Sequence, residues 1–340
     1  LSVNIGVGGM VESFRKTFVG WLDQRLVSEL YIQTSNQNVS EKMKKFLDGK
    51  VEAVLPIVKV SQNIFDSPTE IYGFTPHKTY IDYWPLLRES KETWQKIKQG
   101  KGVIINEQLS RKLNLSISNM IEIESKNGEQ LRFEILGVYS DYGNPKGQVM
   151  LPLKLFKSYF PNEPEVRFAI RLQQSSIPEI RDELNQIFSR EDIIITDQLE
   201  LKNLSKKMFE KTFAITTALS ILTLGIAGMA LFTSITTLGD NRYAQLAPLW
   251  SIGTKRRTLA LLETLRSISL SILTFIFALP VGLVVVFILT NYVNLEAFSW
   301  KLPIFYFPMQ WISLGLVTLF VTILATGLYS IKLAKAAPAE

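Results

Sequence analysis

Three long uncharged runs dominate the C-terminal part of this 340-residue chain. Asp, Glu, Lys and Arg are absent from residues 212–239, 267–295 and 302–331, which number 28, 29 and 30. A helix needs about 20 apolar residues to cross the hydrocarbon core of a bilayer, so each run is long enough. Three such runs in succession favour membrane spans over buried helices of a soluble domain. We predict spans over about 213–238, 267–290 and 310–331.

The charges between these runs predict the orientation of the spans. Connector 240–266 carries five Lys or Arg residues, whereas connector 291–310 carries only Lys301. Cytoplasmic loops are enriched in Lys and Arg, so 240–266 and the C-terminus are predicted to be cytoplasmic and 291–310 to lie outside. The residues before the first span, 12–205, then form one large extracytoplasmic domain, and 206–340 form a transmembrane domain.

The first eleven residues, LSVNIGVGGMV, are uncharged but too few to span a bilayer. They also lack the basic start of a signal peptide. We expect residues 1–11 to be the end of a transmembrane helix that begins upstream, so that the chain is a fragment.

The extracytoplasmic segment has the patterns of a mixed domain. Asn127-Gly128 separates two alternating runs and predicts a β-hairpin over 120–140. EVRFAIRL, a helix over about 176–189 and DIIITD predict a βαβ-like unit. Further strand-like runs occur at 25–34, 51–60 and 69–76. The predicted fold class is therefore an α+β extracytoplasmic domain plus an α-helical transmembrane bundle, with three complete spans and the end of a fourth.

Several kinds of chemistry lack the residues they need. The chain has no cysteine, and its one histidine, His77, follows Pro76 and is interpreted as a turn residue. GVGGM and IGTKRR do not have the context or spacing of dinucleotide or phosphate loops. The basic excess lies on connectors between apolar runs rather than on a soluble face, which disfavours nucleic-acid binding. We predict no catalytic, cofactor-binding or metal-binding residue.

Residues 246–263, LAPLWSIGTKRRTLALLE, form a segment that we call the elbow. Leu246, Leu249 and Trp250 are predicted to share one face of a short helix on the inner membrane surface. Gly253 can end that helix in the left-handed conformation, and Thr254 is suited to cap the next one.

Three cations follow directly in the elbow: Lys255, Arg256 and Arg257. At a helix start they oppose the helix dipole by some tenths of a kcal/mol each, whereas anionic head groups offer about 1 kcal/mol per cation. We therefore predict lipid head groups as their partners. The alternative is that the cations only determine topology.

The whole arrangement resembles the FtsX-like permeases of ABC transporters, which include the MacB and LolC/LolE types. Leu249, Gly253, Arg256 and Glu263 occupy the positions of that family's elbow pattern, and GVIINEQLSRKLNLSISNMIEIESKNGEQLRFEILGVYSDYG and KAAPAE are similar to other family segments. The resemblance implies that the elbow docks on an ABC ATPase subunit, through Leu246, Leu249, Trp250, Ile252, Gly253 and Glu263.

The resemblance also implies a function. The chain would be a permease subunit of the bacterial inner membrane, in which ATP hydrolysis by the partner moves the outside domain. ATP and Mg would be bound by that ATPase, and this chain would not be an enzyme. ESFRKTFVGWLDQRL resembles the long members with two such units in one chain, which implies that this chain is the C-terminal unit of a longer one. A second permease unit would be either upstream in the same chain or a homodimer partner. The substrate would be a lipoprotein, lipid, peptide or similar amphiphile; the alternative is a regulator that activates an extracytoplasmic hydrolase.

Overall fold

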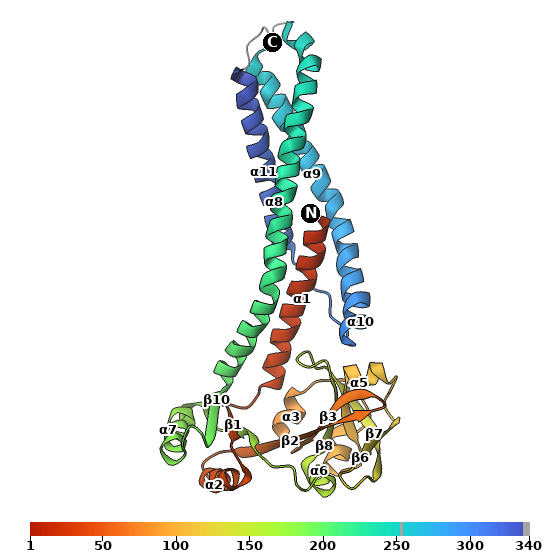
Figure 1. Cartoon of the computed structure of the whole chain (residues 1–340), viewed down its shortest axis with the longest axis vertical. Helices are drawn as coiled ribbons and strands as arrows, with labels where there is room; N and C mark the ends of the chain where they lie inside the picture. Colours follow the sequence, from red (N-terminus) through yellow and green to blue (C-terminus); the bar gives the residue numbers. More distant parts are fainter. Residues whose placement is uncertain (252–253, 336–340) are drawn as a thin grey trace. The chain divides into compact units, whose positions relative to one another are not determined.

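The computed structural model (Figure 1) describes residues 1–251 and 254–335. Side chains are described in these ranges except at residues 231, 235–236, 238–251, 256–257, 259–260 and 328–335. The chain forms two compact units. The helical unit comprises Leu1–Arg15, Glu210–Val293 and the residues from Leu302 onward, and the α+β unit comprises Lys16–Phe209 and Asn294–Lys301.

Long helices make up the helical unit. They are the first part of α1 (Ser2–Arg25), most of α8 (Gln198–Ser251), α9 (Arg256–Ile288) and α11 (Pro308–Lys335). A π-helical turn, Leu289–Val293, and the short α10, Asn294–Phe298, follow α9. Within the described residues, three helical stretches are long and apolar enough to cross a membrane: Gln198–Ser234, Leu261–Phe298 and Pro308–Gly327. The three predicted spans are thus confirmed as apolar helices.

Glycines let α1 and α9 approach closely within the helical unit. A methyl group added to Gly6 would collide with the side chain of Val285, and one added to Gly282 would lie 2.6 Å from Cγ2 of Ile5. Each helix therefore places a glycine against a branched side chain of the other. Small residues of this kind bring backbones together where no hydrophobic driving force acts between helices.

The strands of the α+β unit form one ten-stranded sheet in the order β10-β1-β9-β2-β3-β8-β5-β7-β4, with β6 paired to β7. They are β1 Leu30–Thr34, β2 Ala53–Ile64, β3 Ser67–Phe74, β4 Leu86–Glu89, β5 Val103–Asn106, β6 Met120–Glu124, β7 Gln130–Tyr139, β8 Gly147–Pro152, β9 Arg167–Arg171 and β10 Ile193–Asp197. The helices are α2 Gln37–Leu47, α3 Lys78–Tyr83, α4 Thr93–Lys98, α5 Glu107–Lys112, α6 Leu153–Tyr159 and α7 Ile177–Ile187, with a 3-10 turn at Gln174–Ser176.

Local sequence patterns account for several of these elements. The predicted hairpin is present as antiparallel β6 and β7, and its turn contains Gly128 at a φ of 80°. The predicted βαβ-like unit is β9, α7 and β10, with β1 paired antiparallel to both strands. In Figure 1, α2 and α7 lie beside β1 and β10. Their apolar faces pack with Leu30, Ile32, Phe168 and Ile170 into one core.

Strand β2 links the two ends of the sheet. Residues 53–56 pair with β9, and residues 57–64 pair with β3. Pro56, which has no N–H to donate to a ladder, stands where β2 changes partner. A second core lies around Ile71, Ile105 and Ile135, and a third around Phe74, Tyr80 and Ile104. β2 contributes a side chain to each of the three cores, so it joins them in a single domain.

The glycine contacts of α1 predict opposite effects for two neighbouring substitutions. Gly6→Ala should lower the thermal stability of the purified chain in detergent, because overpacking a tight contact costs about 1–3 kcal/mol. Gly8 is the matched control, since an added methyl group there has nothing within 4 Å. Gly8→Ala should be neutral or stabilising, by up to about 1 kcal/mol of helix propensity. Equal unfolding temperatures for the two variants would contradict the close α1–α9 contact.

Candidate functional site

The backbone of the elbow differs from the prediction in two ways. Helix α8 continues without a break through the positions of Leu246, Leu249 and Trp250 to Ser251, so the separate short helix is wrong. A break there would leave amide and carbonyl groups without intrahelical partners, whereas continuing the helix pairs them. Ile252 and Gly253 lie outside the described residues, and their predicted roles stay predictions.

The second helix of the elbow begins one residue later than expected. Lys255, not Thr254, is the N-cap of α9, and no side-chain hydrogen bond caps that end. The predicted cap is therefore wrong: Thr254 stands one position too early for its hydroxyl to reach the first free amides. Arg256 and Arg257 are the first two residues of α9, Lys255 is exposed, and Glu263 is half-buried farther along. The contacts assigned to the elbow's side chains stay predictions.

A second candidate site lies in the loop between β7 and β8, residues 140–146. The ring of Tyr142 contacts Trp21 of α1 edge-on, with 6.3 Å between ring centroids. It also contacts Trp300, which lies between α10 and α11, edge-on at 4.6 Å. We call Trp21, Tyr142 and Trp300 the aromatic joint. The joint brings together three residues that are far apart in the sequence.

Position 143, next to Tyr142, must be glycine because the Trp21 ring lies against the loop there. A methyl group added to Gly143 would lie 2.6 Å from Cη2 of Trp21 and 3.2 Å from Cζ3. Real Cβ atoms do not approach an aromatic carbon so closely, and an indole ring cannot bend away as a flexible side chain can. The Trp21 ring therefore lies directly on the loop backbone.

Hydrogen bonds hold the loop to the sheet. The amide nitrogen Nε2 of the fully buried Gln108, in α5, donates to the carbonyl oxygens of Asp141 and Asn144. The backbone N–H of Gly143 donates to Oδ1 of Asp141 at 2.9 Å. Asn144 Nδ2 donates to Glu70 of β3, also at 2.9 Å. The loop is thus tied to α5 and β3 at several points.

Arg25, in the last turn of α1, places its charge beside this loop. Its guanidinium lies 4.0 Å from the ring centroid of Trp84 and 5.2 Å from that of Tyr139. Asp141 is 3% exposed. Burial raises the pKa of the Asp141 carboxyl, while the positive charge of Arg25 acts against that rise. The end of α1 therefore carries a cation held by two aromatic rings and near one buried carboxyl group.

The segment around Trp300 is also fixed to the α+β unit. Trp300 is 2% exposed, and its carbonyl oxygen accepts a hydrogen bond from Asn294 Nδ2 at 2.9 Å. The next residue, Lys301, donates its backbone N–H to Glu107 Oε1 at 3.3 Å. Glu107 in turn forms an ion pair of 2.8 Å with Arg111. These contacts place residues 294–301 in the α+β unit.

Helices α1 and α8 meet where both join the α+β unit. The rings of Phe18 and Phe209 stack with centroids 4.8 Å apart. Lys202 forms an ion pair of 2.9 Å with Asp23. These two contacts join α1 to α8 at residues that belong to the α+β unit.

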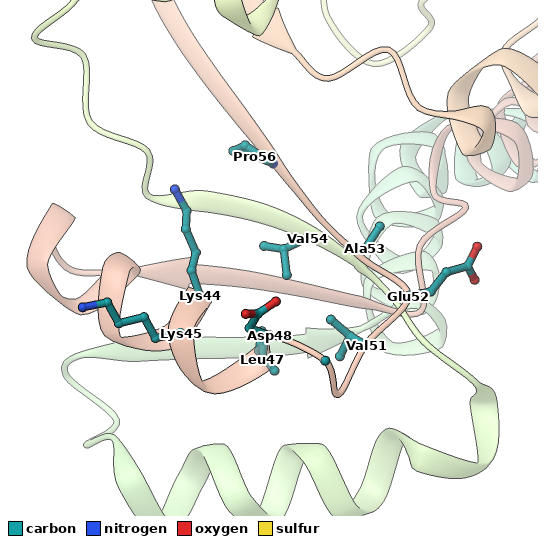
Figure 2. A pocket seen from close by; sticks show the side chains of 10 residues that line it. Lys44, Lys45, Leu47, Asp48, Val51, Glu52, Ala53, Val54 and Pro56 are labelled. Carbon is teal, nitrogen blue, oxygen red and sulfur yellow. The ribbon is translucent and has the colours of Figure 1, made fainter.

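An open pocket of about 580 Å³ lies between α2 and β2 (Figure 2). Its lining includes two basic residues, Lys44 and Lys45, and two acidic residues, Asp48 and Glu52. Figure 2 shows the lysines reaching away from Glu52. Lys44 is paired with Glu165, and Glu52 with Lys78. The four charges of the lining therefore balance one another.

The one histidine of the sequence, His77, has a structural role. His77 is the N-cap of α3, where its Nδ1 accepts the backbone N–H of Thr79 at 3.3 Å. In the part of the chain that the structure describes, no group of three or more His, Asp or Glu side chains could hold a metal ion. The sequence prediction missed the aromatic joint, although a Tyr-Gly pair in a loop after a buried strand was a signal for it.

Both parts of this chain match known protein families. Residues 1–187 match the family described as MacB-like periplasmic core domain, and residues 217–338 match the FtsX-like permease C-terminal family. A curated relative, the "Uncharacterized ABC transporter permease protein" of Mycobacterium tuberculosis, is 24% identical over 358 residues, which cover 97% of this chain and 40% of the relative. The chain therefore spans less than half the length of that relative.

Two solved structures are similar to parts of the chain at low scores. The periplasmic region of MacB from Actinobacillus actinomycetemcomitans has a TM-score of 0.40 and 12% identity, covering 54% of this chain and 95% of that one. The extracellular domain of the noncanonical ABC-type transporter YknZ from Gram-positive bacteria has a TM-score of 0.35 and 14% identity, covering 50% and 99%.

The contact between Gly143 and Trp21 predicts a strong coupling between two substitutions. Gly143→Ala should destabilise the chain by about 1–3 kcal/mol, because its methyl group meets a rigid ring. In a Trp21→Leu background the same substitution should cost much less. Chemical denaturation of the four variants of this double-mutant cycle measures the coupling energy. Additive effects would show that the ring does not lie on the loop.

Proposed function

Because the chain belongs to the FtsX-like permease family of ABC transporters and carries a MacB-like periplasmic core domain, we propose that it couples ATP hydrolysis by a partner ATPase to movement of its α+β unit. The chain is a multi-pass inner-membrane protein with a large extracytoplasmic domain. We assign that domain to residues 12–205 and the permease domain to residues 206–340, of which residues 294–301 pack in the α+β unit.

The observation that carries this proposal is the anchoring of three separate segments in the α+β unit. A domain that only needed attachment to the membrane would require one flexible tether. Here Trp21 of α1 contacts Tyr142 of the β7–β8 loop, and Glu200 at the start of α8 forms an ion pair with Arg181 of α7. Residues 294–301 are held by the backbone N–H of Lys301, which donates to Glu107. Attachment at several points transmits helix displacements to the sheet instead of absorbing them.

The proposed partners follow from the family and from the elbow. An ABC ATPase would dock on the apolar side chains of the elbow and would bind ATP and Mg²⁺, while Lys255, Arg256 and Arg257 would contact lipid head groups. A second permease unit, upstream or in a homodimer, would complete the assembly. Movement of the outside domain would act on an amphiphile such as a lipoprotein, lipid or peptide.

One experiment tests both the coupling and the substrate class. The full-length protein is purified with its ATPase and reconstituted in nanodiscs, and the molecules that co-purify are identified by mass spectrometry. We expect ATP turnover only when the ATPase subunit is present, and an amphiphile that ATP releases. Turnover by the permease chain alone would overturn the proposal. Activation of a co-purified extracytoplasmic hydrolase without release of any amphiphile would favour the regulator instead of a transporter.

The elbow predicts a difference between two double variants. Leu249→Ala with Trp250→Ala should still fold but lose the ATPase, since apolar anchors often cost about 2 kcal/mol or more when truncated, roughly thirtyfold in affinity. Arg256→Gln with Arg257→Gln is the matched control and should keep the ATPase while binding anionic lipid more weakly. Co-purification and ATPase stimulation measure both. If the apolar variant retains the ATPase and the arginine variant loses it, the assigned roles are reversed.

A further inference from the structure

We propose that Tyr142 is the positioning residue through which α1 and the α10–α11 connector together move the sheet of the outside domain. This inference rests on the proposed coupling to an ATPase. It assigns a specific place where that coupling enters the α+β unit.

The first support is the position of Tyr142 relative to the chain. Its two ring partners, Trp21 and Trp300, belong to segments that lead into helices of the helical unit. Trp21 is part of α1, whose residues up to Arg15 lie in that unit. Trp300 is two residues before Leu302, where the chain re-enters the helical unit. A displacement of either segment therefore meets the same ring.

The second support is that the loop cannot absorb such a displacement by itself. Gln108 of α5 holds two of its carbonyl oxygens, and Asn144 is bonded to Glu70 of β3. Glu70 is 5% exposed and is held in turn by Lys59 at 3.0 Å. Movement of the Tyr142 ring thus passes into β3 and α5 rather than into a flexible turn.

The third support is how closely the Trp21 ring fits against the loop at Gly143. The Trp21 ring lies on the loop so closely that only glycine fits at position 143. The indole Nε1 of Trp21 is buried and has no hydrogen-bond partner among the described residues. The contact therefore combines a position that only glycine fits with an indole N–H that no described protein group accepts. The close fit of this particular ring favours a role in contact geometry.

The test compares Tyr142→Ala with Tyr142→Phe and Tyr83→Ala in the full-length protein with its ATPase in nanodiscs. Phenylalanine keeps the ring, and Tyr83 is a 53% exposed tyrosine of α3 that controls for loss of a surface ring. This chain has no cysteine, so spin labels at Ser175→Cys in the α+β unit and Ser269→Cys in α9 report their distance after any upstream cysteines are replaced. Distances are measured without nucleotide and with ATP and vanadate.

We expect the unsubstituted protein, Tyr142→Phe and Tyr83→Ala to show the same ATP-dependent distance change. Tyr142→Ala should lose that change while hydrolysing ATP at the rate of the unsubstituted protein. A full distance change in Tyr142→Ala would overturn the inference while leaving the proposed function intact, and no change in the unsubstituted protein would overturn the proposed function itself. If Tyr142→Ala does not fold, Trp300→Leu removes one partner of the ring, and the same two outcomes decide.

Discussion

The hydrocarbon core of a bilayer offers no water to the backbone, and the rest of this structure depends on that constraint. The part of each uncharged run that crosses the membrane must satisfy its amide and carbonyl groups internally, so it forms a helix. Polar side chains within these helices also find partners: Thr322 Oγ1 donates to Ser271 Oγ at 3.1 Å, and Thr290 Oγ1 donates to the carbonyl of Val286 at 2.8 Å. Such helices are stiff, so a force applied at one end reaches the other.

Whether a displacement of the helices reaches the sheet depends on the contacts that join α1 and α8 to the rest of the α+β unit. The ion pair between Lys202 and Asp23 is largely open to water on the Asp23 side and contributes about 0–1 kcal/mol. Aromatic pairs contribute about 0.5–1.5 kcal/mol each beyond their buried area, and burial of the rings adds to that. The aromatic joint therefore contributes more than this ion pair and is less sensitive to salt.

Much of the fold is predictable because its signals are local. Charge-free length indicates the spans, the Asn127-Gly128 turn indicates the β6–β7 hairpin, and alternation indicates the strands. Long-range pairing is not encoded in this way. Nothing near β1 shows that it lies between β9 and β10, and Pro56 alone does not reveal that β2 changes partners. Thr254 was misassigned because capping residues predict a helix start only to within a residue or two.

The two candidate sites differ in how far sequence can reveal them. The elbow is a continuous segment, so its composition and its resemblance to a family point to it directly. The aromatic joint joins residues 21, 142 and 300, which each look like ordinary aromatic residues until the fold brings them together.

The β7–β8 loop gives a further indication of function. Four consecutive residues have four separate tasks: Asp141 accepts from the loop backbone, Tyr142 contacts two rings, Gly143 admits one of them, and Asn144 bonds Glu70. A loop that only connected two strands would not need so many exact partners, and this is why its residues argue for a role in motion.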